Sequence, residues 1–76
     1  MKIVEVKALS LKTVAGFECL VVERNSETDD LNTGDKIVVN GKELTLSRPP
    51  MLPHIYGDTI TMPVFQEELF NAFIAA

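Results

Sequence analysis

The chain has 76 residues and a formal net charge of −4, and 46% of its residues are hydrophobic against 24% charged. This length predicts a single domain, residues 1–76, with a small core. The acidic balance and the scattered lysines and arginines argue against direct binding of nucleic acid, which needs clustered basic residues. The apolar runs are too short to span a bilayer, so we expect no membrane partner.

Cys19 is the only cysteine and His54 is the only histidine. An intrachain disulfide is therefore excluded, and we expect neither a metal nor another cofactor. The first residues carry no export signal, so the lone thiol favours a reducing, cytoplasmic location. A domain this small with so much apolar sequence is often stabilised by a second subunit, and we expect a homo-oligomer.

Residues 2–11 alternate in polarity, as a strand does. Residues 14–24 form the longest β-rich run, in which Phe17, Cys19 and Val21 alternate with Glu18, Leu20 and Val22. Because both faces of that run are largely apolar, we expect a central or doubly covered strand. Gly16 near its start predicts a bulge or bend.

The clearest local signal is a β-hairpin at residues 35–46. Asn40 and Gly41 separate two β-rich runs, and this pair favours a type I′ turn, in which both residues have positive φ. A two-residue loop fixes the register, with Val39 opposite Lys42 and Ile37 opposite Leu44. The side chains predicted to share the inner face are Ile37, Val39, Leu44 and Leu46.

The remaining segments alternate between loop and regular structure. Residues 25–34 are polar and predict a loop with a helical turn after Ser26, and residues 47–57 contain prolines that favour extended backbone. Residues 59–64 predict a strand with Ile60, Met62 and Val64 pointing inward, and the outward Pro63 suits an edge or a strand end.

One helix is predicted, at about residues 65–75. Phe65, Leu69 and Phe73 recur at helical spacing, and Phe70 with Ile74 forms an adjacent row. The whole pattern predicts a mainly β fold: a small, partly open antiparallel β-barrel or roll of about five strands with one C-terminal α-helix.

No set of residues points to catalysis. Cys19 is in phase with Phe17 and Val21, which predicts a buried thiol rather than a nucleophile. His54 lies in an apolar, proline-rich loop with no paired nucleophile, and the acidic loop at residues 29–35 does not match the ligand spacing of a calcium loop. We therefore expect no catalytic residue and no enzymatic activity.

Two apolar segments are the candidate protein interface. The proline-rich loop retains large apolar side chains, and the helix carries a stripe wider than a small sheet requires. The predicted interface residues are Met51, Leu52, Ile55, Tyr56, Phe70 and Ile74. The competing interpretation is that the loop plugs an open barrel end and the helix only caps the core.

These observations predict a small protein-interaction module: an adaptor, inhibitor or assembly factor that binds another protein, itself, or both. One alternative is an acidic module that occupies the basic groove of a nucleic-acid-binding protein through Glu23, Glu27, Asp29, Asp30 and Asp35. A further alternative is an enzyme subunit whose site is shared between chains.

Overall fold

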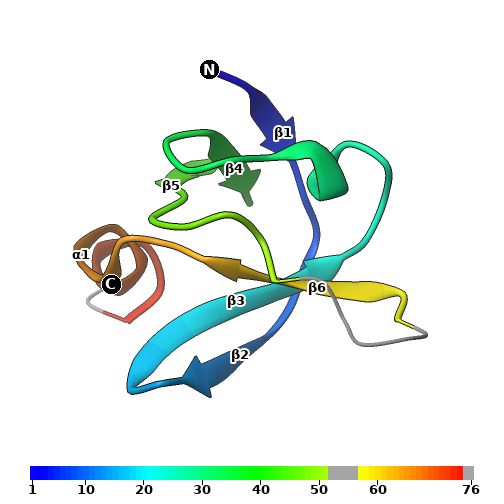
Figure 1. Ribbon diagram of the computed structural model, residues 1–76. Coiled ribbons are helices and arrows are strands. Elements are labelled where there is room, and N and C mark those ends of the chain that lie inside the picture. The colour runs from blue at the N-terminus through cyan, green and yellow to red at the C-terminus, as the bar shows by residue number, and fades with distance from the viewer. Residues whose placement is uncertain (52–56, 75–76) are drawn as a thin grey trace.

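The computed structural model describes residues 1–51 and 57–74, and for Ile74 the backbone only. The fold is mainly β, as predicted, with two three-stranded sheets and one C-terminal helix (Figure 1). One sheet has the strand order β1-β4-β5 and the other β2-β3-β6. The strands are β1 (Ile3–Glu5), β2 (Ala8–Val14), β3 (Phe17–Glu23), β4 (Lys36–Val39), β5 (Lys42–Thr45) and β6 (Thr59–Pro63).

The predicted hairpin is confirmed in strands β4 and β5. Asn40 and Gly41 have φ values of 52° and 79°, as a type I′ turn requires. Val39 lies opposite Lys42 and Ile37 opposite Leu44, which is the predicted register. The four side chains assigned to the inner face are all buried, and they are Ile37, Val39, Leu44 and Leu46.

A second two-residue hairpin joins β2 and β3. The prediction of a bulge or bend within one strand over residues 14–24 was wrong. Val14 lies opposite Phe17, and Ala15 and Gly16 between them have φ values of 52° and 83°. Ala15 is an unusual residue for positive φ, because its Cβ makes the left-handed region unfavourable. The strand begins only at Phe17, after this turn.

The expected single strand at residues 2–11 is divided between the two sheets. β1 pairs in parallel with β4, and the Val6 N–H still donates to the Val38 carbonyl oxygen at 2.9 Å. The chain then crosses to the other sheet, where the register of β2 against β3 shifts between Ala8 and Ser10. This crossing, rather than Gly16, is the corner of the fold.

The two sheets also meet at the end of β5. Leu46 forms an isolated antiparallel bridge with Val64, and the Phe65 N–H donates to the Thr45 carbonyl oxygen at 3.1 Å. The sheets are thus linked at this corner and at the β1–β2 crossing without forming a closed barrel. The result confirms the partly open roll.

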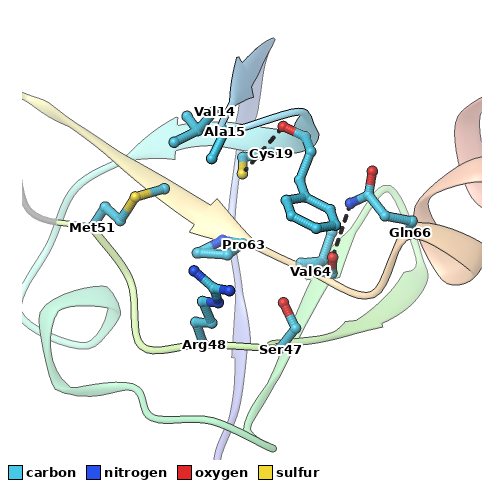
Figure 2. Close-up of a pocket in the computed structure, with 10 residues that line it drawn as sticks. Val14, Ala15, Cys19, Ser47, Arg48, Met51, Pro63, Val64 and Gln66 are labelled. Atoms are coloured by element: carbon cyan, nitrogen blue, oxygen red, sulfur yellow. Dashed lines mark hydrogen bonds between the residues drawn. The ribbon is translucent and has the colours of Figure 1, made fainter.

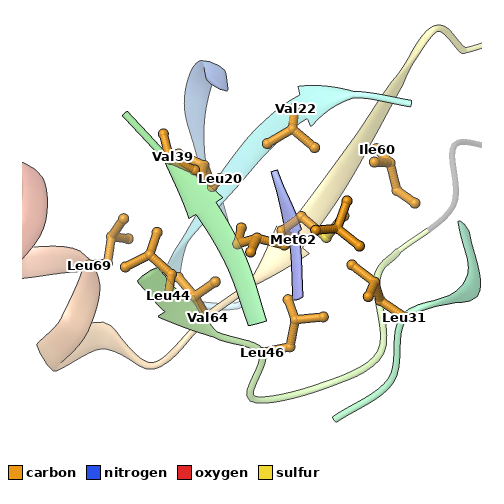
Figure 3. Close-up of a cluster of buried hydrophobic side chains, with 12 residues drawn as sticks. Leu20, Val22, Leu31, Val39, Leu44, Leu46, Ile60, Met62, Val64 and Leu69 are labelled. Carbon is orange, nitrogen blue, oxygen red and sulfur yellow. The ribbon is translucent and has the colours of Figure 1, made fainter. Parts of the chain in front are cut away.

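The core lies between the two sheets and under the helix. Figure 3 shows side chains from β3, β4, β5 and β6 pointing toward one another. Ile60, Met62 and Val64 are buried there, as predicted. Leu69 from the helix and Leu31 from the acidic loop complete the same cluster. The helix therefore caps the core with at least one face.

The acidic loop contains the predicted helical turn, a 3-10 helix η1 (Thr28–Asp30). Asn25 begins this turn, because its Oδ1 accepts hydrogen bonds from the N–H groups of Glu27 (2.8 Å) and Thr28 (2.9 Å). The buried Thr28 hydroxyl accepts from the Asn25 N–H and donates to the Asn25 carbonyl oxygen. Such local bonds hold a polar loop that has little apolar surface to bury.

The helix consists of α1 (Gln66–Leu69) followed by a π-helical turn, η2 (Phe70–Ile74). It docks on the outer edge of β5, where the Thr45 N–H donates to Glu68 Oε1 at 2.6 Å. Lys42 Nζ donates to the Ala72 carbonyl oxygen at 2.7 Å near the other end of the helix. No helix within residues 1–51 and 57–74 has the length and apolar character needed to cross a membrane.

Candidate functional site

A cavity of about 210 Å³ opens on the outer face of the β2-β3-β6 sheet (Figure 2). Its lining comes from the β2–β3 turn, from β3 and β6, from residues 47–51 and from the start of the helix. The lining residues are Val14, Ala15, Phe17, Cys19, Ser47, Arg48, Met51, Pro63, Val64 and Gln66. Segments distant in sequence therefore create one concave surface on the face opposite the core.

The backbone of residues 46–51 creates one wall of this cavity. Leu46 bridges to Val64 and Met51 bridges to Thr61. Residues 47–50 therefore lie opposite only two residues, 62 and 63, of the neighbouring segment. The extra residues must bulge out of the sheet. Pro63 has no N–H, and its carbonyl oxygen accepts from the Ser47 N–H at 3.0 Å on this outer edge. The predicted edge position of Pro63 is confirmed.

The cavity is apolar with a few polar groups at its margin. The Arg48 guanidinium extends toward Pro63 in Figure 2 and takes part in none of the ion pairs among the described residues. Burial, followed by the nearby Glu18 carboxylate, raises the pKa of the Cys19 thiol above its ordinary value. A thiol with a raised pKa is a poor nucleophile, so Cys19 contributes apolar surface and the prediction of a buried structural thiol is confirmed.

Gln66 connects the cavity to the exposed side of the helix. Its Oε1 accepts from the Glu18 N–H at 3.0 Å, and its Nε2 donates to the Glu18 carbonyl oxygen at 2.8 Å. The same Gln66 borders a second, open hollow, together with Glu18, Glu67, Leu69 and Phe70. The two concave regions thus share one residue that is fixed by hydrogen bonds to β3.

Large apolar side chains flank Gln66 on both sides. Phe17 is 52% exposed, Phe70 is 50% exposed and Met51 is 36% exposed. We call the surface formed by Phe17, Arg48, Met51, Gln66 and Phe70 the Gln66 surface. Exposed aromatic, methionine and arginine side chains around a rigid polar group are typical of protein interfaces.

The structure places two of the predicted interface residues on this surface. Met51 lines the cavity, and Phe70 lines the hollow beside the helix. Leu52, Ile55 and Tyr56 lie outside the described residues, as does His54, and the side chain of Ile74 also lies outside the description. For all six residues, the interface role stays a prediction.

Sequence reasoning missed Phe17, Arg48 and Gln66. Phe17 belongs to the central strand β3, as predicted, but it is the first residue of that strand, directly after the Ala15–Gly16 turn, and its side chain is therefore exposed. Gln66 is polar at a helix start, and nothing in the local sequence indicates that it binds β3. Its contact with Glu18 spans 48 positions in sequence.

The acidic residues proposed to imitate a nucleic acid are mostly bound within the chain. Asp29 accepts from Arg24 Nε at 2.9 Å, Asp30 binds Lys2, and Glu23 lies 4.0 Å from Lys7 Nζ. The Asp35 carboxylate is buried and accepts backbone hydrogen bonds from the N–H groups of Lys2 and Asn32. These carboxylates are thus paired or hydrogen-bonded within the chain, whereas an acidic binding patch would present them to a basic groove.

Comparisons of the chain with models of protein families, with curated proteins and with solved structures gave no match, so the function is argued from the residues themselves.

Proposed function

We propose that this protein is a non-enzymatic interaction module that binds another protein through the Gln66 surface. The observation that supports the proposal most is the placement of three exposed apolar side chains, Phe17, Met51 and Phe70, around one cavity and its neighbouring hollow. Hydration of such surface is unfavourable, and a partner that covers it gains free energy.

The size of the cavity favours an anchoring side chain of a protein over a free small molecule. Small-molecule sites enclose about 300–1,000 Å³. The cavity measures about 210 Å³ and is bordered by the exposed side chains of Phe17 and Met51. In an interface of this kind, one apolar side chain of the partner fills the cavity while surrounding residues exclude water.

The polar groups at the margin give such an interface its specificity. Gln66 is held by Glu18, and Arg48 has no carboxylate partner among the described residues. Arg48 can therefore bind a carboxylate or carbonyl oxygen beside the partner's apolar side chain. The proline-rich segment limits the conformational freedom lost on binding, since Pro49 and Pro50 already restrict the backbone.

The test is quantitative capture of partners from extracts of the native host by the wild-type protein and by Met51→Asp and Phe70→Asp. Both positions are exposed, so we expect the variants to fold, which circular dichroism and urea denaturation check. Loss of an interface anchor weakens binding by roughly 30-fold or more. Ile3→Asp is the matched control, because Ile3 is 55% exposed on β1 and lies outside the Gln66 surface.

Retention of every captured protein by both surface variants would contradict the proposal. Salt separates it from the acidic-module alternative, because an apolar interface depends weakly on ionic strength and a charged one strongly. A cytoplasmic location and a homo-oligomeric state belong to the same proposal.

A further inference from the structure

Sheet edges carry unpaired N–H and C=O groups that can pair with another chain, and proteins usually cover long ones. Two of the edges here are covered. On β5, the Thr45 N–H donates to Glu68 and the Thr45 carbonyl oxygen accepts from Phe65. On β6, Thr61 exchanges hydrogen bonds of 2.9 and 3.3 Å with Met51. The edge of β1 is only three residues long.

The outer edge of β2 is both long and uncovered within the described residues. β2 has seven residues, and its interior, residues 9–13, is exposed throughout. Figure 1 shows β2 at the margin of its sheet with β3 on its inner side. The strand contains no proline, and its one charged residue is Lys12. The usual devices that protect an edge strand are therefore sparse here.

The hydrogen-bonding phase of β2 identifies the backbone groups that face outward. Thr13 lies opposite Glu18, and the Glu18 N–H and carbonyl oxygen point away from β2 toward Gln66. Thr13 and Glu18 are therefore a non-hydrogen-bonded pair. In such an antiparallel pair the N–H and C=O groups of both residues point away from each other, so the backbone groups of Thr13 point away from β3. The same alternation directs the backbone groups of Leu11 outward.

We propose that β2 pairs antiparallel with β2 of a second copy of this chain, about a two-fold axis at Leu11. Leu11 then exchanges both backbone hydrogen bonds with its counterpart, and Ser10 faces Lys12 of the second copy. Leu11, which is 45% exposed, meets its counterpart at the junction, and Leu9, which is 47% exposed, lies opposite Thr13 of the second copy. The two β2-β3-β6 sheets become one continuous sheet of twice the width.

The side chains of β2 favour a second copy and this register. A two-fold axis at Lys12 would place two ammonium groups opposite each other, which is unfavourable. An axis at Ser10 would pair Leu11 with Leu9, where the register shift interrupts regular bonding. The axis at Leu11 avoids both problems, and identical strands supply matched donors and acceptors without any further partner.

The test uses sedimentation equilibrium on the full chain, with Leu11→Lys and Leu11→Glu measured separately and mixed. We expect the wild type to dimerise and each variant to be monomeric, since like charges would then meet at the axis. Mixing the two variants should restore a dimer, because lysine and glutamate then lie opposite each other. Ile3→Lys is the control and should dimerise like the wild type.

A monomeric wild-type chain over the whole concentration series would overturn the proposal, and so would a Leu11→Lys variant that dimerises as the wild type does. Failure of the mixture to form a dimer would overturn the register at Leu11. Circular dichroism of each variant establishes that the fold is intact. Because Leu11 lies outside the Gln66 surface, these results are independent of the partner-capture experiment.

Discussion

The Gln66 carboxamide replaces a backbone strand beside Glu18. It accepts from the Glu18 N–H at 3.0 Å and donates to the Glu18 carbonyl oxygen at 2.8 Å, as an adjacent peptide group would. The β3–β6 ladder ends at the Cys19–Pro63 pair, so Gln66 extends the pairing by one further position. This contact fixes the start of the helix to β3. It also fixes the residue that the cavity and the neighbouring hollow share in their linings.

Replacing Gln66 with glutamate should destabilise the fold by about 1–2 kcal/mol, because the carboxylate cannot donate to the Glu18 carbonyl oxygen. Urea denaturation of Gln66→Glu and the wild type at neutral pH measures this difference. Glu67→Gln is the control, since Glu67 is exposed on the same helical turn and its side chain makes no hydrogen bond in the described residues. Equal midpoints for Gln66→Glu and the wild type would show that the contact contributes nothing.

Exchanging alanine and asparagine at the first position of the two hairpin turns should change the stability of the protein in opposite directions. Ala15 and Asn40 both have φ of 52° at the first position of a two-residue turn. Asparagine tolerates this conformation better than alanine, so Ala15→Asn should stabilise the protein by about 1 kcal/mol. Asn40→Ala should destabilise it by a similar amount. Thermal or urea denaturation of both variants checks the signs, and a change in the same direction for both would contradict the turn assignment.

Stability should fall in acid through Asp35. Hydrogen bonds from the backbone N–H groups of Lys2 and Asn32 hold the pKa of Asp35 below its ordinary value of 3.8. A carboxyl group with a lowered folded-state pKa stabilises the fold above its unfolded pKa, and this contribution is lost as pH falls through the folded pKa. The advantage of the wild type over Asp35→Asn should therefore be larger at about pH 6 than at about pH 3.

Urea denaturation over this pH range measures that difference. Glu5→Gln is the control, because the exposed Glu5 carboxylate makes no hydrogen bond or ion pair among the described residues. An Asp35→Asn variant whose deficit is the same at both pH values would assign the loss to packing rather than to the charge.

The inner face of the β4–β5 hairpin should tolerate truncation far less than its outer face. Leu44 is fully buried in the core, so Leu44→Ala should cost about 2–5 kcal/mol. Val38 lies on the opposite face and is half-buried, so Val38→Ala should cost much less. Denaturant midpoints for the two variants make the comparison, and equal losses would contradict the assignment of the faces.

Local chemistry explains which parts of the fold were predictable. Asn40-Gly41 is a strong turn signal, and the alternation around it gave the correct register without any long-range information. The Ala15–Gly16 turn was missed because alanine rarely takes positive φ. The division of residues 2–11 was missed because alternation continues through Val6 and Ala8 with no proline or glycine at the crossing.

The candidate site was predictable only in part. Met51 and Phe70 stand out in sequence because large apolar residues are conspicuous in a proline-rich loop and beside a complete helical stripe. Phe17 and Gln66 join them only through contacts between distant segments, such as Gln66 with Glu18. No local pattern encodes such contacts, and the same holds for the parallel pairing of β1 with β4.

The most direct test of the proposed function is photocrosslinking from the Gln66 surface. A photoreactive phenylalanine analogue placed at Phe70 changes an already exposed aromatic side chain very little, and the same analogue at the exposed Ile3 is the control. Irradiation in host cells should crosslink position 70, and not position 3, to a protein that is also lost in the Met51→Asp capture. Equal crosslinking from both positions, or crosslinking from position 3 alone, would contradict the account.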